Sequence, residues 1–122
     1  MVEPLHTVAY TAAFLAQAKA DGMAEAEMEA MERMLAANPE AGEMIVGSGG
    51  CRKVRIAGKG RGKSGGYRVV TFFAHAGLPV YLVAMLSKGG RANFSAAEVA
   101  AMAMMAKRIV AAGAIGRRVD RD

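Results

Sequence analysis

Positive charges that could hold phosphate are concentrated in one short stretch of the chain. Residues 52–68 contain seven lysines and arginines and no acidic residue. Guanidinium groups stay charged and can hold two phosphate oxygens at once, so this stretch favours an anionic partner. The alternative is a basic surface that contacts only solvent. We predict binding to nucleic acid, because seven neighbouring cations repel one another unless an anion is present. They are Arg52, Lys53, Arg55, Lys59, Arg61, Lys63 and Arg68.

The spacing of Lys53 and Arg55 places both side chains on one face of a strand predicted over residues 52–57. Side chains alternate along a strand, so Val54 and Ile56 point to the other face. The two cations then lie about 7 Å apart on the exposed face. An apolar face and a cationic face on one strand are typical of a sheet that packs on one side and binds an anion on the other.

Residues 57–64, AGKGRGKS, fit a loose form of the phosphate-binding loop. That loop needs a strand before it and a helix after it, because the amide groups of the helix N-terminus bind the phosphates. Here two glycines follow Ser64, and a β-prone run begins at Tyr67. We therefore predict a basic, glycine-rich hairpin and no nucleotide site at residues 57–64. Its glycines would let the backbone approach a phosphate chain closely.

The remaining pattern predicts the element order β-α-α-β-β-β-α. Thr11 is a typical N-cap residue and Gly22 a typical end of the first helix. Ser95 and Glu98 form a predicted capping box, and Gly113 is the predicted end of the last helix. Strands are predicted over residues 5–10, 52–57, 67–74 and 79–86, and helices over residues 12–20, 24–37 and from residue 96.

The chain of 122 residues is short enough for a single domain, which we expect over residues 1–116 with a disordered basic tail over residues 117–122. Cys51 is the only cysteine, so we expect no disulfide, no metal site and a reducing, cytoplasmic location. No signal peptide and no run of about 18 apolar residues is present, so we expect no membrane contact. Residues 1–50 carry a net charge of −6 and residues 51–122 a net charge of +11.

Four segments in order resemble the RelE/HigB group of bacterial toxins, within the RelE/ParE superfamily. They are AANPEAGEMI, GGCRKVRIAGKGRGKSGGYRVVTFF, PVYLVAMLSKG and FSAAEVAAM. The resemblance covers roughly residues 5–112. It implies an α+β fold like that of microbial ribonucleases, with a small twisted, mainly antiparallel sheet packed with helices. It also implies a toxin of a toxin–antitoxin system that cleaves mRNA without a metal or other cofactor, on the translating ribosome, and a cognate antitoxin that is a small DNA-binding protein.

The resemblance also implies roles for individual residues. Cations two residues apart on the second strand of the family face the RNA, and Lys53 and Arg55 match them. The Gly-Tyr-Arg start of the third strand matches residues 66–68, so Arg68 would point to the scissile phosphate. Lys88 and Arg91 could each supply the charge of an arginine that relatives carry after the fourth strand. The predicted catalytic residues are thus Lys53, Arg55, Arg68 and Lys88, and the predicted RNA-binding residues are Arg52, Lys59, Arg61, Lys63, Arg91 and Phe94.

The group that would accept the proton of the RNA 2′-hydroxyl stays open. Relatives commonly carry a tyrosine in the C-terminal segment, but no tyrosine follows Tyr81 here. Phe94 can stack on a base but cannot exchange a proton. The candidates are Lys53 in its neutral form, His75 and Tyr67, although a hairpin-tip histidine is commonly solvated and Tyr67 could equally pack in the core.

Two other functions fit the same sequence. One is a relative that binds RNA or a partner without cleaving, which the missing tyrosine favours. The other is inhibition of a topoisomerase, as in the ParE branch of the superfamily. An endoribonuclease is the main expectation, because three cations on rigid strands suit the stabilisation of a phosphorane.

Overall fold

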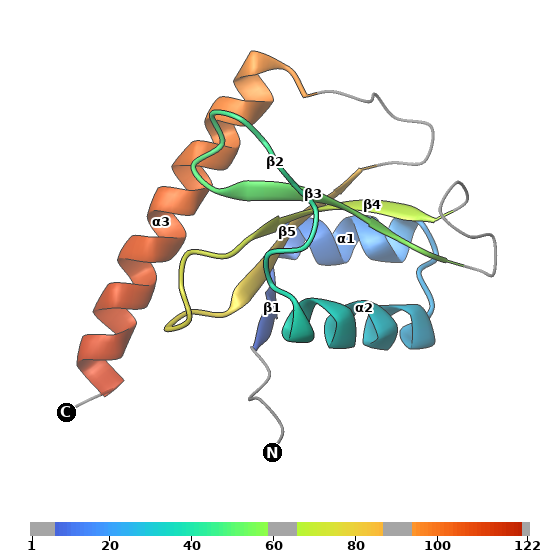
Figure 1. Ribbon diagram of the computed structural model, residues 1–122, viewed down its shortest axis with the longest axis horizontal. Coiled ribbons are helices and arrows are strands. Elements are labelled where there is room, and N and C mark those ends of the chain that lie inside the picture. The colour runs from blue at the N-terminus through green and yellow to red at the C-terminus, as the bar shows by residue number, and fades with distance from the viewer. Residues whose placement is uncertain (1–6, 59–65, 87–93, 121–122) are drawn as a thin grey trace.

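The computed structural model describes residues 7–58, 66–86 and 94–120 and has three layers (Figure 1). Two helices pack on one face of a mixed sheet, and the third helix packs on the other face. The predicted order of the main elements is confirmed. The elements are β1 (Val8–Tyr10), α1 (Ala12–Ala20), α2 (Glu25–Ala37), β2 (Glu43–Met44), β3 (Cys51–Ile56), β4 (Tyr67–Phe72), β5 (Val80–Leu86) and α3 (Ala96–Asp120).

The strands lie in the order β1-β5-β4-β3-β2. The pairs β2–β3, β3–β4 and β4–β5 are antiparallel, and β1 pairs with β5 in parallel. The predicted mainly antiparallel α+β architecture is therefore confirmed. The parallel pair arises because the chain leaves β1 through α1 and α2 and returns to its side only with the last strand.

The first helix begins and ends where its residue types predict. The Thr11 hydroxyl accepts a hydrogen bond from the Phe14 N–H at 3.1 Å and donates one to the Val83 carbonyl at 2.7 Å. It therefore caps α1 and ties the helix to β5. At the other end Gly22 has a φ of 72°, and its N–H and that of Met23 donate to carbonyls of the last turn. This pair of bonds is a Schellman end, which favours glycine at this position.

Two apolar clusters, one on each face of the sheet, hold the layers together. The first lies under α1 and α2, and its fully buried members include Phe14, Leu35, Val69, Val80 and Leu82. The second lies under α3 and consists of Cys51, Val70, Phe72, Val83, Met102 and Ala106. A sheet buried on both faces leaves few positions on β4 for polar side chains, so Arg68 is a conspicuous exception there.

The last helix is longer than its sequence predicts. The capping box is present, since the Glu98 N–H donates to the Ser95 hydroxyl and the Ser95 N–H donates to the Glu98 carboxylate. The predicted end at Gly113 is wrong, because α3 continues to Asp120. The helix thus includes residues 117–120, where a disordered tail was expected. An interior glycine costs a helix only about 1 kcal/mol, and strong helix formers flank Gly113.

Other differences concern strand ends and a short extra strand. β1 begins at Val8, later than predicted, and residues 5 and 6 lie outside the described residues. β2 has two residues and no alternating pattern that could have revealed it. Within the described residues, no helix is long and apolar enough to cross a membrane. The single-domain boundary at residue 116 stays a prediction.

A buried serine fixes the hairpin that joins β2 to β3. The Ser48 hydroxyl donates to the Ile45 carbonyl at 2.6 Å and accepts from the Cys51 N–H at 2.9 Å. The Ile45 N–H in turn donates to the Cys51 carbonyl. Because Ser48 is fully buried, water cannot replace these bonds if the hydroxyl is removed.

We expect Ser48→Ala to lower the free energy of unfolding by about 2 kcal/mol, because it leaves a buried N–H without a partner. Val46→Ala in the same hairpin is the control, since Val46 is 89% exposed and its truncation should change stability by less than about 0.5 kcal/mol. Urea unfolding of both variants measures the difference. Equal stabilities would show that the Ser48 bonds do not hold the hairpin.

Candidate functional site

The face of the sheet under α3 changes from apolar to cationic along the strands. The change is seen in three successive rows, each of which is a pair of residues that lie opposite each other on β3 and β4. In the first row Cys51 is opposite Phe72, and both belong to the apolar cluster under α3. In the second row Lys53 is opposite Val70. In the third row two cations, Arg55 and Arg68, are opposite each other. The predicted placing of Lys53 and Arg55 on the face opposite to Val54 and Ile56 agrees with this order.

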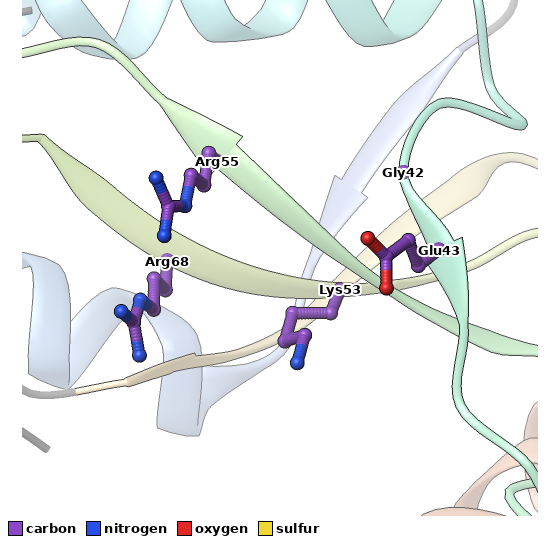
Figure 2. A pocket seen from close by; sticks show the side chains of 5 residues that line it. All are labelled: Gly42, Glu43, Lys53, Arg55 and Arg68. Atoms are coloured by element: carbon purple, nitrogen blue, oxygen red, sulfur yellow. The ribbon is translucent and has the colours of Figure 1, made fainter. Parts of the chain in front are cut away.

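The cationic end of this face is hollowed. A cavity of about 380 Å³ is lined by Gly42, Glu43, Lys53, Arg55 and Arg68, and we call it the cation hollow. Figure 2 shows the side chains of both arginines and of Lys53 on the same side of the sheet, with the Glu43 carboxylate beyond Lys53 on β2. Three of the four predicted catalytic residues therefore meet in one place. The fourth, Lys88, lies outside the described residues.

Repulsion between Arg55 and Arg68 weakens the pairing of β3 with β4, although this pairing is what brings the two arginines together. Cβ atoms of directly opposite residues lie about 5 Å apart, and like charges in this relation destabilise a sheet. Arg68 is half-buried, whereas Arg55 is exposed. Within the described residues no hydrogen bond or ion pair joins either guanidinium to another side chain. An arrangement that concentrates positive charge without neutralising it is suited to an anionic ligand.

Glu43 is the site residue that the sequence did not reveal. It lies directly opposite Lys53 in the β2–β3 pair, so both side chains point to the same face. β2 can approach β3 so closely because residue 42 is glycine: a Cβ there would lie 2.4 Å from the Lys53 carbonyl oxygen, and its φ is +93°. The signal in the sequence was a glycine directly before an acidic residue, which by itself is too common to single out.

Tyr67 packs in the core and does not face the site. Strand alternation places it on the opposite face from Arg68, where it belongs to the cluster under α1 and α2. Its hydroxyl donates to a Glu27 carboxylate oxygen at 2.9 Å. Burial, with the hydrogen bond and negative charge of Glu27, raises the pKa of Tyr67 to about 12. Both its position and its protonation exclude Tyr67 as the base of a reaction in the cation hollow.

His75 lies in the turn between β4 and β5, at the opposite end of β4 from Arg68. Its ring is exposed, and its Nδ1 accepts a hydrogen bond from the Gly77 N–H at 3.0 Å. This local bond stabilises the turn. Of the three candidate bases considered from the sequence, only Lys53 lines the cation hollow.

The predicted RNA-binding residues lie in different parts of the structure. Arg52 alternates with Lys53, so it leaves the strand on the opposite face, and its guanidinium donates to the Gly42 carbonyl at 3.2 Å. Phe94 packs beside the apolar cluster under α3 and lines a second cavity next to the cation hollow. The roles of both residues in RNA binding stay predictions. Lys59, Arg61, Lys63 and Arg91 lie outside the described residues, as Lys88 does.

The topology around the glycine-rich segment agrees with the predicted hairpin. β3 and β4 form an antiparallel pair in which Ile56 is opposite Tyr67, so the segment between them joins two neighbouring strands. A strand, and no helix, follows the AGKGRGKS sequence. In the part of the chain that the structure describes, no three His, Cys, Asp or Glu side chains gather to form a metal site.

A comparison with protein families finds a match to this chain. The model of the RelE family, described as the RelE toxin of the RelE/RelB toxin–antitoxin system, matches residues 7–115. The match includes all five strands, both N-terminal helices and most of α3. The resemblance noted from short sequence segments is thereby confirmed over nearly the whole chain.

The position of Tyr67 predicts a loss of stability at alkaline pH. Its pKa is about 12 in the folded chain and 10 in the ordinary state, so the unfolded chain loses this proton first as pH rises. The contribution to stability is complete below pH 10 and falls between pH 10 and 12, by an amount on the order of 2–3 kcal/mol. Tyr67→Phe should weaken this decrease, measured by urea unfolding at pH 8 and pH 11.

Tyr81→Phe, which removes a hydroxyl on the other face of the sheet, is the control and should retain the decrease because Tyr67 is still present. If Tyr67→Phe and the unmodified protein lose equal stability between pH 8 and pH 11, the Tyr67–Glu27 bond does not control the titration.

Proposed function

This chain belongs to the RelE toxin family, and we propose that it is an endoribonuclease that cleaves mRNA, on the translating ribosome, at the cation hollow. The observation that carries this proposal is the convergence of Lys53, Arg55 and Arg68 on one hollow from two paired strands. The family is one of toxins that act with an antitoxin. We further propose that the antitoxin of this chain is a small DNA-binding protein encoded with it.

Cleavage of RNA by its own 2′-hydroxyl needs charge stabilisation at the phosphate. As the 2′-oxygen attacks phosphorus, negative charge develops on the non-bridging oxygens of a pentavalent phosphorane. Arg55 and Arg68 are placed to bind these oxygens, because guanidiniums stay charged and offer paired donors. Both belong to strands in the middle of the sheet, so little reorganisation is needed when the charge develops.

Glu43 supplies the missing proton acceptor in this proposal. A lysine ammonium has donors only, whereas an ionised carboxylate has two acceptor oxygens. Glu43 is the one carboxylate among the described residues that line the cation hollow. We assign to it the proton of the 2′-hydroxyl, and to the Lys53 ammonium the proton that the leaving 5′-oxygen takes up. The reaction then needs no tyrosine in the C-terminal segment.

The basic segment that follows β3 would hold the RNA backbone. Lys59, Arg61 and Lys63 stand in the sequence between two strands whose facing ends carry Arg55 and Arg68. Contacts from these residues to phosphates would add affinity without reading sequence. In this proposal the residues on the strands carry out the chemistry, and the connecting segment provides affinity that does not depend on the RNA sequence.

We expect Arg68→Ala to reduce single-turnover cleavage of a ribosome-bound message by about 100-fold, the usual effect of removing a charge-stabilising group. RNA binding should fall much less, since one phosphate contact among several is lost. Arg68→Lys should recover only part of the rate, because an ammonium cannot make the paired contact.

Arg108→Ala is the matched control, since Arg108 is an exposed arginine on α3 and its loss changes the net charge equally. Equal losses of binding and cleavage in Arg68→Ala would reduce Arg68 to a residue that positions RNA. If the unmodified protein cleaves neither free nor ribosome-bound RNA, the nuclease proposal fails, and binding without cleavage or topoisomerase inhibition remains.

We expect Glu43→Gln to lower the cleavage rate by about 100-fold, within the usual effect of a general base. Folding should be unaffected, because Glu43 is exposed. Glu40→Gln, an exposed carboxylate on the same connection but outside the hollow, is the control. An unchanged cleavage rate in Glu43→Gln would exclude Glu43 as the proton acceptor.

A further inference from the structure

The ladder between β3 and β4 ends one row beyond the two arginines. Ile56 and Tyr67 form its last pair, and Arg55 and Arg68 form the pair before it. The end of a ladder opens more easily than its middle, because the last pair has a neighbouring pair on one side only. Repulsion between the two arginines favours the same opening. The arginine row is therefore the part of this ladder that most needs support.

Tyr67 is held from the opposite face of the sheet. It is 9% exposed, and its hydroxyl donates to the Glu27 carboxylate oxygen Oε1 at 2.9 Å. The same oxygen accepts the Ala24 N–H at 2.8 Å, at the start of α2. Hydrogen bonds to an ionised acceptor are stronger than those between neutral groups. This bond therefore ties the beginning of β4 to the beginning of α2.

The chain after β3 packs against the same two side chains. Gly58 is buried, and a Cβ there would overlap the Tyr67 ring and lie 2.9 Å from the other carboxylate oxygen of Glu27. Before β4, a Cβ at Gly66 would overlap the Ile56 carbonyl. Only glycine allows these two approaches. The two strands are thus packed closely where their ladder ends, and the Glu27–Tyr67 bond lies at this point.

The helix that carries Glu27 is itself fixed to the sheet. Met31 and Leu35, one and two turns further along α2, are buried in the cluster under α1 and α2. A second bond of the same kind also reaches this helix, since the Tyr10 hydroxyl donates to Glu32. Tyr10 lies on β1, at the edge of the sheet, and does not line the cation hollow. Of two tyrosine–carboxylate bonds to one helix, only one therefore adjoins the arginine row.

We propose that Glu27 and Tyr67 are positioning residues, which hold the end of the β3–β4 ladder closed so that Arg55 and Arg68 are already in place when RNA binds. The catalytic part of this inference rests on the proposed function of the cation hollow. Neither positioning residue touches RNA, because their bond lies on the other face of the sheet from the hollow. Loss of the bond leaves the charges of the hollow unchanged and disturbs only their placement.

Hydrogen exchange of backbone amides, followed by NMR on the full chain, measures the opening of the ladder without any need for cleavage. We expect Tyr67→Phe to raise exchange at residues 54–56 and 67–69 by about 10-fold, the effect of losing one hydrogen bond to a charged group. Tyr10→Phe is the matched control and should leave exchange at these residues unchanged. Arg55→Gln, added to Tyr67→Phe, should reverse part of the increase, because it removes the repulsion.

Single-turnover cleavage of a ribosome-bound message tests the catalytic part. We expect Tyr67→Phe to lower the maximal rate by about 10-fold and to change RNA affinity little, because misplaced groups lose rate even where they still bind. Glu27→Gln keeps an acceptor oxygen and should retain more of the rate than Glu27→Ala. Tyr10→Phe should cleave as the unmodified protein does. In Arg68→Ala, adding Tyr67→Phe should have no further effect, since both changes act through one group.

The outcomes separate this inference from the proposed function. Exchange that is faster in Tyr67→Phe than in Tyr10→Phe, in a protein that does not cleave RNA, would sink the nuclease function and keep the support of the arginine row. Equal exchange and equal cleavage in the two variants would overturn the inference and leave the nuclease function standing, because Tyr67 would then contribute only to overall stability. Faster exchange with an unchanged cleavage rate would also overturn the positioning role.

Discussion

Arg55 and Arg68 face each other across β3 and β4, and the rest of the structure has to hold them there. Two like charges in a directly opposed pair weaken the pairing of their strands by an amount on the order of 0.2–1 kcal/mol. The neighbouring residues on the other face of these strands offset this, because Val54, Ile56 and Val69 are all buried in the cluster under α1 and α2. Burial of each such side chain contributes about 1.5–3 kcal/mol. The apolar face of the sheet thus stabilises the cationic face.

The position of α3 decides how much of the sheet remains open. Its buried residues Met102 and Ala106 cover the row that contains Cys51 and Phe72, and the cation hollow begins one row further along the strands. Figure 1 shows the helix crossing one end of the sheet and leaving the other end uncovered by it. A helix centred over the middle of the sheet would have buried the arginines without partners. The open end instead lets a polyanion reach charges that are already held in place by two central strands.

The fold places much of the negative charge of the chain and the cation hollow on different faces of the sheet. Four of the eight acidic residues of residues 1–50 lie in α2, where Glu27 and Glu32 accept hydrogen bonds from Tyr67 and Tyr10 on the face away from the site. Negative charge is thereby kept off the cationic face. Glu43 is the exception, because the short strand β2 returns one carboxylate to the basic residues. Among the described residues that line the cation hollow, one carboxylate thus lies with three cations, which are the groups that the proposed cleavage of RNA would use.

Local interactions explain what the sequence alone determined. The N-cap at Thr11, the Schellman end at Gly22 and the capping box of Ser95 and Glu98 each involve residues within a few positions of one another, and all three were predicted and are present. The alternation of β3 likewise follows from neighbouring residues, so the shared face of Lys53 and Arg55 could be predicted. The family could be recognised because these local patterns occur in a characteristic order along the chain.

Contacts between distant segments decided the rest. Strand register placed Arg68 opposite Arg55 and turned Tyr67 toward Glu27, forty residues away, where no local pattern points. The approach of β2 to β3 at Gly42 brought Glu43 to the site, although two residues are too few to show the period of a strand. The second cavity next to the cation hollow is lined by the hairpin after β2, by Phe94 and by α3 together. The continuation of α3 past Gly113 also went against the local signal, since a glycine weakens a helix without ending it. The chemistry of single residues can therefore be predicted from the sequence. Which of these residues come together depends on packing between elements that are far apart in the sequence.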